Sequence, residues 1–195
     1  MAPGWCPGVG VIATFVFATL PSLASSSTWD LDPAATRIAF SVRNLSVAYV
    51  DGTFRLASGH VEVDDTDVLR STVEAVIDAA SVDTNEPKRD THLRSADFLD
   101  VTRYPTLVFR STRIEEAGSD HWTVTGTLTL LGTTRPVVLD VRRSPAEGNR
   151  MTVRASTTID RRDFGITYSG YAVGTEVVIS IEAVGIQPPA DALPE

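Results

Sequence analysis

A short charged segment carries the side chains of this chain that are best suited to chemistry. Within residues 84–100, Arg89, Asp90 and His92 combine a permanent cation, a carboxylate and an imidazole that titrates near neutral pH. On a helix, Asp90 and His92 are two positions apart and therefore do not face each other. Three interpretations are open: a capped helix held by charge-assisted hydrogen bonds, contact with the polar head of a ligand, or catalysis. The spacing favours the first.

The rest of the sequence gives catalysis and metal binding little support. A hydrolase or isomerase would have to use His92 with Asp90 or Asp97 as acid and base. The chain has no Gly-x-Ser-x-Gly elbow, and its one cysteine is Cys6, close to the start. The three histidines fall in separate segments without metal-ligand spacing. We therefore assign no catalytic residue, no metal ligand and no cofactor.

The segments that must position these residues read as strands. Apolar and polar residues alternate with a period of two, as is typical of half-buried strands. Residues 121–130 show this most clearly, because Trp122, Val124, Gly126, Leu128 and Leu130 fall on one face and mostly threonines on the other. The segments with this character lie near residues 37–43, 53–63, 72–77, 106–115, 121–130, 137–142, 150–159 and 176–182. The sequence predicts an all-β fold, a single antiparallel barrel or sandwich of about eight strands.

Residues 86–98 interrupt the strands with a short helical pattern. Pro87 suits a first helical turn, and Thr84 or Asn85 is expected to cap it. Leu93, Ala96 and Phe98 are expected to face the sheet. The basic side chains are expected to face water, and they are Lys88, Arg89 and Arg94.

An eight-stranded barrel either fills with side chains or holds one small ligand. The residues expected to point inward are large aromatic and aliphatic side chains, and Val, Ala and Gly lie between them. They are Phe40, Phe54, Phe109, Trp122, Leu128 and Leu139. Such a lining suits a long apolar molecule, but a filled core would use the same residues. The pattern alone leaves the two possibilities open.

The first 24 residues contain no charged side chain, and residues 10–20 form an apolar run. This run is too short for a bilayer, which needs about 20 apolar residues. Pro21 ends it, and Ser22-Leu23-Ala24 suits a signal-peptidase site. We expect a signal peptide at 1–24, a barrel domain at 25–187 and a flexible C-terminal tail at 188–195.

The net charge of −8 argues against binding to nucleic acid or to anionic membranes, both of which need a basic face. Once the signal is cleaved, no stable membrane insertion is expected, and the protein is predicted to be periplasmic or secreted. The sequence leaves the oligomeric state open, and a homodimer is one possibility.

Several short motifs occur in an order and spacing that is specific as a set. They include WDLDP at 29–33, FSVRNL at 40–45, GTF at 52–54, RDTHL at 89–93, FLD at 98–100, GTLTLLG at 126–132, IDRRDFGI at 159–166 and VGTEV at 173–177. In this combination the chain resembles the YceI-like, polyisoprenoid-binding family of secreted bacterial proteins. The resemblance covers residues 29–187, nearly all of the predicted domain.

The resemblance implies a lipocalin-like barrel that holds an isoprenoid or quinone-like lipid and has no established catalytic role. The residues expected to line the ligand site are Phe40, Val42, Phe54, Phe109, Leu128, Leu130 and Leu139. Weaker candidates for the polar end are Arg89, His92 and Asn44. Family members often carry His where this chain has Asn44, which cannot titrate near neutral pH.

The leading hypothesis is therefore a binding protein that carries or sequesters an isoprenoid. Two alternatives are a stress-related interaction protein with a filled barrel and, less favoured, an enzyme that uses His92.

Overall fold

The computed structural model describes residues 26–44, 48–145, 147–168 and 173–188. The predicted signal at 1–24 and the tail after residue 188 lie outside these ranges. The elements are β1 (Ser26–Leu31), β2 (Arg37–Asn44), β3 (Ala48–Asp64), η1 (Val68–Arg70), β4 (Thr72–Asp83), α1 (Pro87–Arg94), β5 (Thr106–Gly118), β6 (His121–Leu130), β7 (Thr133–Arg143), β8 (Arg150–Asp160), η2 (Arg161–Phe164) and β9 (Val173–Ile186).

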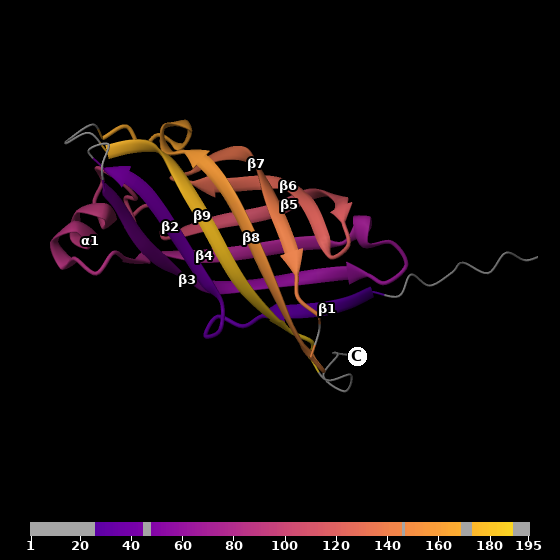
Figure 1. Cartoon of the computed structure of the whole chain (residues 1–195). Helices are drawn as coiled ribbons and strands as arrows, with labels where there is room; N and C mark the ends of the chain where they lie inside the picture. The colour runs from indigo at the N-terminus through magenta and orange to yellow at the C-terminus, as the bar shows by residue number, and fades with distance from the viewer. Residues whose placement is uncertain (1–25, 45–47, 146, 169–172, 189–195) are drawn as a thin grey trace, which may run out of the picture.

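Eight strands close into one antiparallel barrel in the order β3-β2-β9-β8-β7-β6-β5-β4, and the β3–β4 pairing completes the circle (Figure 1). The predicted all-β, eight-stranded barrel with one short helix is confirmed. Because neighbouring strands are antiparallel, β4, β6, β8 and β2 end at the same end of the barrel. α1 follows β4 and η2 follows β8, so both lie at that end. None of the described helices has the length and apolar composition needed to cross a membrane.

β1 is an additional strand that the period-two analysis did not predict. It pairs with the last residues of β3 and β9, whereas β2 pairs with the first part of β3 and with the first ten residues of β9. β1 and β2 therefore lie one after the other between β3 and β9, in the same position of the barrel wall. Between them, Asp32 Oδ1 accepts hydrogen bonds from the backbone N–H groups of Ala34 and Ala35, which makes a turn where Pro33 offers no N–H.

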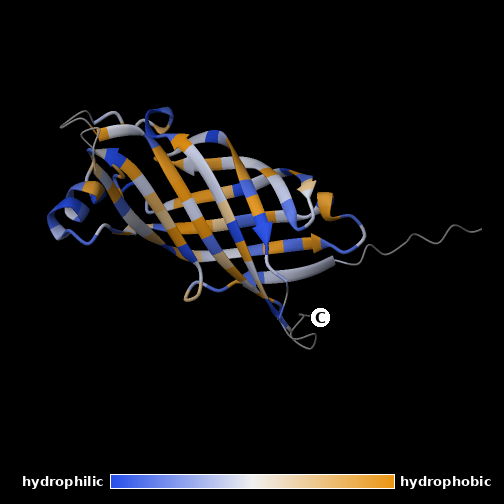
Figure 2. Cartoon of the chain, viewed as in Figure 1, coloured by the Kyte–Doolittle hydropathy of each residue, from blue (hydrophilic) through white to orange (hydrophobic). Residues whose placement is uncertain are grey.

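The alternation predicted for β6 is confirmed. Val124, Leu128 and Leu130 are buried, while the threonines between them are partly exposed. Figure 2 shows the same banding along the other strands, with hydrophobic and hydrophilic residues in turn, and a largely hydrophilic α1. One face of each strand therefore points into the barrel.

Two inward glycines allow two phenylalanine rings to lie flat against the barrel wall. A Cβ added at Gly52 would lie 2.4 Å from the Phe40 ring, and one added at Gly126 would lie 2.5 Å from the Phe109 ring. Phe40 and Gly52 are direct cross-strand partners. The rings occupy the space that side chains at the glycines would take. The wall is thereby covered without filling the centre.

Replacing Gly126 with alanine should lower the free energy of unfolding by about 2 kcal/mol, as overpacking does in a tight core. The new methyl group would meet the Arg110 carbonyl oxygen at 2.5 Å as well as the Phe109 ring. Denaturant titration measures the loss. Gly148→Ala cannot serve as the control, because the φ of +63° at Gly148 would strain an alanine there. Ala57→Gly changes the same methyl group at an exposed position of β3, where no packing is altered, and shows what the methyl group alone contributes. Equal midpoints for wild type and Gly126→Ala would contradict this packing.

The helix differs from the prediction at both ends. Its N-cap is Glu86, whose carboxylate accepts hydrogen bonds from the backbone N–H groups of Lys88 and Arg89. Thr84 and Asn85 are not the cap, because Thr84 is bonded elsewhere and Asn85 has a φ of 59°. The helix ends at Arg94, and turns rather than helix follow.

The expected orientation of the helical side chains is only partly correct. Leu93 and Phe98 do point into the barrel, but Ala96 is exposed. Arg94 is not directed into water, since its guanidinium donates to the carbonyl oxygens of Ala80 and Val82 at the end of β4. This clamp fixes α1 against the barrel.

Candidate functional site

The barrel encloses a cavity of about 630 Å³. Small-molecule sites usually measure about 300–1,000 Å³ and are mostly apolar. Each of β2 to β9 contributes side chains to the lining, together with α1, and these are overwhelmingly Val, Leu, Ile, Phe and Ala. Of the two possibilities that the sequence left open, the structure therefore shows the hollow barrel.

Nine of the ten predicted site residues line this cavity. They are Phe40, Val42, Phe54, Phe109, Leu128, Leu130, Leu139, Arg89 and His92. The tenth, Asn44, ends β2 and pairs through its backbone with Ala48, and its side chain lies outside the described part of the structure. That these residues contact a ligand stays a prediction.

None of the ten predicted site residues lies in the wall formed by β8 and β9. The cavity residues there include Val153, Ala155, Thr157, Ile159, Val177, Ile179 and Ile181. In β9 the outward-facing residue Val178 is also apolar, which blurs the alternation. In the middle of β8 the inward Ala155 and Thr157 resemble the outward Ser156 and Thr158. Pairing with β9 reveals their direction, but the sequence does not contain that information.

Arg89 belongs to a polar cluster at the end of the cavity next to α1. Its Nε donates to the hydroxyl of Thr84 at 2.7 Å, and its Nη2 donates to the Thr84 carbonyl at 2.8 Å. The buried Asp90 carboxylate accepts from the Thr84 hydroxyl and from the Thr84 N–H. Thr84 therefore joins a cation and a carboxylate that do not contact each other. Such charge-assisted bonds hold the guanidinium in one orientation.

His92 lies three residues after Arg89 in α1 and packs against two aromatic rings. Its centroid is 5.0 Å from those of Phe98 and Tyr168, and both contacts are nearly perpendicular. Its Nε2 is 2.9 Å from a carboxylate oxygen of Asp97. The Asp90 carboxylate instead bonds Thr84, so the structure forms one of the two acid–base pairs considered from sequence, His92 with Asp97. No group of three potential metal ligands occurs among the described residues.

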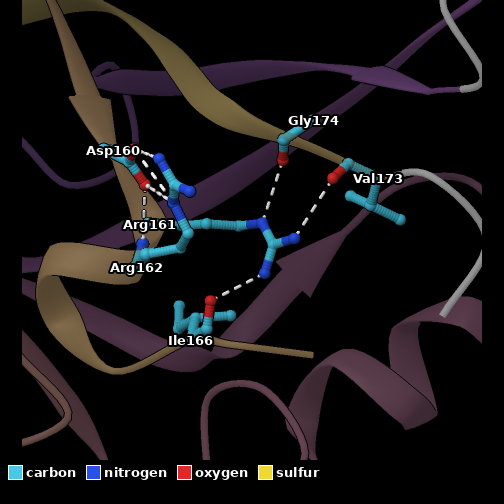
Figure 3. A network of polar contacts seen from close by, with 6 residues as sticks. All are labelled: Asp160, Arg161, Arg162, Ile166, Val173 and Gly174. Atoms are coloured by element: carbon cyan, nitrogen blue, oxygen red, sulfur yellow. Dashed lines mark hydrogen bonds and ion pairs between the residues drawn. The ribbon is translucent and has the colours of Figure 1, made fainter. Parts of the chain in front are cut away.

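Arg161 connects η2 to Ile166 and to the first residues of β9 through hydrogen bonds. Figure 3 shows its guanidinium between three backbone carbonyls: Nε donates to Gly174 at 2.9 Å, Nη1 to Ile166 at 2.6 Å and Nη2 to Val173 at 3.1 Å. The residue is 7% exposed and lines the cavity. Burial lowers the pKa of its guanidinium from the ordinary value.

The neighbouring Asp160 carboxylate is bound by Arg162 rather than by Arg161 (Figure 3). The side chain and the backbone N–H of Arg162 both donate to it, and these bonds lower the pKa of Asp160 from 3.8 to about 2. A depressed carboxyl pKa means that this contribution to stability is present above pH 3.8 and is lost as the pH falls toward 2.

NMR titration of the Asp160 carboxyl carbon should give a pKa of about 2 in the wild type. In Arg162→Met the pKa should rise toward 3.8, because the first and largest cause of the shift is removed. The Asp64 carboxyl, whose pKa is lowered by hydrogen bonds from Thr66, should titrate identically in both proteins. An unchanged Asp160 pKa in the variant would show that Arg162 is not the cause.

At the opposite end of the cavity, the basic side chain is paired. Arg143 is 2.6 Å from the Asp120 carboxylate and lies over the Trp122 ring, with its guanidinium carbon 5.3 Å from the ring centroid. His121 is hydrogen-bonded to Asp140, and this bond lowers the pKa of Asp140. The two ends of the cavity thus differ in how their basic groups are neutralised.

Comparison with known proteins places this geometry in a family. The model of the YceI-like domain matches residues 29–185. The protein YceI of Salmonella newport is 33% identical over 181 residues, which cover 90% of this chain and 94% of the relative.

Two solved structures share the fold. Burkholderia cenocepacia BcnA superposes with a TM-score of 0.73 at 24% identity, covering 79% of this chain and 98% of BcnA. A polyisoprenoid binding domain from Saccharophagus degradans superposes with a TM-score of 0.66 at 16% identity, covering 82% and 98%. The closed barrel, the matched domain and the full-length relative lead to one conclusion: this chain belongs to the YceI-like family.

Proposed function

We propose that this protein binds an isoprenoid, or a lipid with a similarly long apolar chain, inside its barrel and carries or sequesters it in an aqueous compartment. The observation that supports this most strongly is the apolar cavity of about 630 Å³. The likeness to the Saccharophagus degradans domain, which is polyisoprenoid-binding, adds support. Quinone-like lipids are included, because their prenyl tails offer the same apolar surface.

The driving force would be the transfer of the chain from water into the barrel. Burial of apolar surface contributes roughly 25 cal/mol per Å², or about 0.8 kcal/mol for each CH₂ group, before the cost of ordering is subtracted. The contacts would come from side chains on opposite walls, such as Phe54, Phe109 and Ile179. A prenyl tail can therefore bind tightly with few polar contacts.

Binding rather than catalysis is the function best supported. Phe98 and Tyr168 pack against the imidazole of His92 with their rings nearly perpendicular to it, and Asp97 is bonded to its Nε2. This arrangement supports a structural role for His92 at the end of the cavity.

Export is the second part of the proposal. Residues 1–24 have the apolar run and the small residues of a signal peptide, and these features support export. Intact mass measurement of the protein recovered from the periplasm or medium tests this. A mature chain that begins at or next to Ser25 is expected, whereas full-length protein retained in the cytoplasm would contradict it.

A series of prenols tests the binding site. Geraniol, farnesol and geranylgeraniol should bind with affinities that rise by about tenfold or more for each added isoprene unit. The rise should stop once the cavity is full. Isothermal titration calorimetry below the critical micelle concentrations measures this, with a heat-capacity decrease on binding as a second readout. Equal, weak affinities for all three alcohols would contradict binding in the cavity.

A further inference from the structure

The side chains that line the cavity and can carry a charge near neutral pH are all basic. They are Arg89, His92, Arg143 and Arg161, and no Asp or Glu of the described residues lines it. This contrasts with the chain as a whole, whose net charge is −8. The acidic groups therefore lie outside a cavity whose own charge is positive.

Among the described residues, two of these basic groups form ion pairs with carboxylates, and no ion pair is formed by the other two. Arg143 pairs with Asp120, and His92 bonds Asp97. Within the described part of the chain, the guanidinium groups of Arg89 and Arg161 are hydrogen-bonded only to Thr84 and to backbone carbonyls. The carboxylates next to them in the sequence are hydrogen-bonded to other groups, since Asp90 bonds Thr84 and Asp160 bonds Arg162.

Both arginines lie at the same end of the barrel. Arg89 is in α1, after β4, and Arg161 is in η2, after β8 (Figure 1). Each guanidinium has five N–H donors. The described partners use two of them on Arg89 and three on Arg161. Donors therefore remain beside an apolar cavity, where the low dielectric strengthens the attraction of an anion.

We propose that the α1 end of the cavity binds an anionic head group, a carboxylate or a phosphate, of the amphiphile whose chain fills the barrel. Arg89 contacts the head group directly, because it is half-buried and keeps three donors. Arg161 supplies a fixed positive charge nearby while it binds the carbonyls of Ile166 and of the first two residues of β9. This inference rests on the proposed lipid binding and adds to it the class of head group and the orientation of the lipid.

The test compares ligands that share one chain and differ in the head group. Geranylgeranyl phosphate, geranylgeranoic acid, geranylgeraniol and geranylgeranylamine are titrated into the mature protein at low salt. At least one of the two anions should bind about tenfold or more tightly than the alcohol, and the amine should bind more weakly than the alcohol. The two anionic arms distinguish a phosphate from a carboxylate head.

Two charge-matched variants locate the effect. Arg89→Gln should abolish the preference for the anion, measured within that variant as the ratio of its affinities for the anion and for the alcohol. Arg103→Gln removes an equal charge from an exposed loop next to α1, where Arg103 pairs with Asp100, and should keep the preference. If Arg89→Gln does not fold, Arg89→Lys, which keeps the charge, should keep most of the preference.

The outcomes separate the two proposals. Binding of the alcohol as tight as that of both anions would overturn the anionic site and leave the lipid-binding proposal standing. Tighter binding of the amine, or an equal loss of preference in Arg103→Gln, would also overturn it. Failure of all four ligands to bind would overturn lipid binding itself, and the head-group site with it.

Discussion

Replacing Arg161 with methionine should lower the free energy of unfolding by about 3 kcal/mol or more. Methionine keeps an unbranched side chain but removes the donors to Ile166, Val173 and Gly174. Each carbonyl left without a partner in a buried setting costs about 1–3 kcal/mol. Water that reaches these carbonyls in the variant would reduce the summed cost of the three lost hydrogen bonds. The expected loss of stability is therefore near the low end of that summed cost.

Arg162→Met is the matched control because Arg162 is the next residue in the sequence and the same guanidinium group is removed there. Its side chain is 60% exposed and binds Asp160 at the surface, so its loss should cost less than about 1 kcal/mol. Urea denaturation of both variants measures the difference. Equal stabilities for Arg161→Met and Arg162→Met would mean that the Arg161 hydrogen bonds in Figure 3 contribute nothing beyond a surface pair.

Replacing Ala155 with tryptophan should weaken the binding of a long prenyl chain by about a hundredfold or more. Ala155 lines the cavity from the middle of β8, and an indole there would take the place of several CH₂ groups at about 0.8 kcal/mol each. We expect the fold to accept the ring because Ala155 lines a cavity of about 630 Å³. A charge at Phe109 or Leu128 would give a less clear result, because both are buried in the wall and an unpaired carboxylate there would also destabilise the fold.

Ser156→Trp is the matched control for Ala155→Trp. Ser156 is the next residue on β8 and is exposed on the outer face, so it adds the same ring without entering the cavity. It should bind geranylgeraniol as the wild type does. Equal weakening in the two variants would place the ligand outside the barrel.

The eight barrel strands could be predicted from the sequence because each has one mostly apolar face, as in β6. β1 could not, because it is short and its place in the wall depends on partners more than 100 residues away in β9. The cap of α1 was also missed. The carboxylate of Glu86 caps the helix, where Thr84 or Asn85 was expected. Thr84 instead links Arg89 and Asp90 through hydrogen bonds.

The site could be predicted in its residue types but not in its shape. Phe40 and Phe109 serve equally well in a filled core or a hollow barrel. What decides between them is the contact of each ring with a glycine on another strand. Similarly, nothing in Asp160-Arg161-Arg162-Asp163 indicates which arginine is buried. That is decided by the left-handed Gly165, which turns the chain so that the Ile166 carbonyl meets Arg161.

Native mass spectrometry of the mature protein after incubation with geranylgeraniol, compared with Ala155→Trp and Ser156→Trp, tests the central claim most directly. We expect one lipid per protein on the wild type and on Ser156→Trp, and little or none on Ala155→Trp. Organic extraction of the retained species should return the intact lipid. No retained lipid on the folded wild-type protein, or equal retention by all three proteins, would contradict a ligand site inside the barrel.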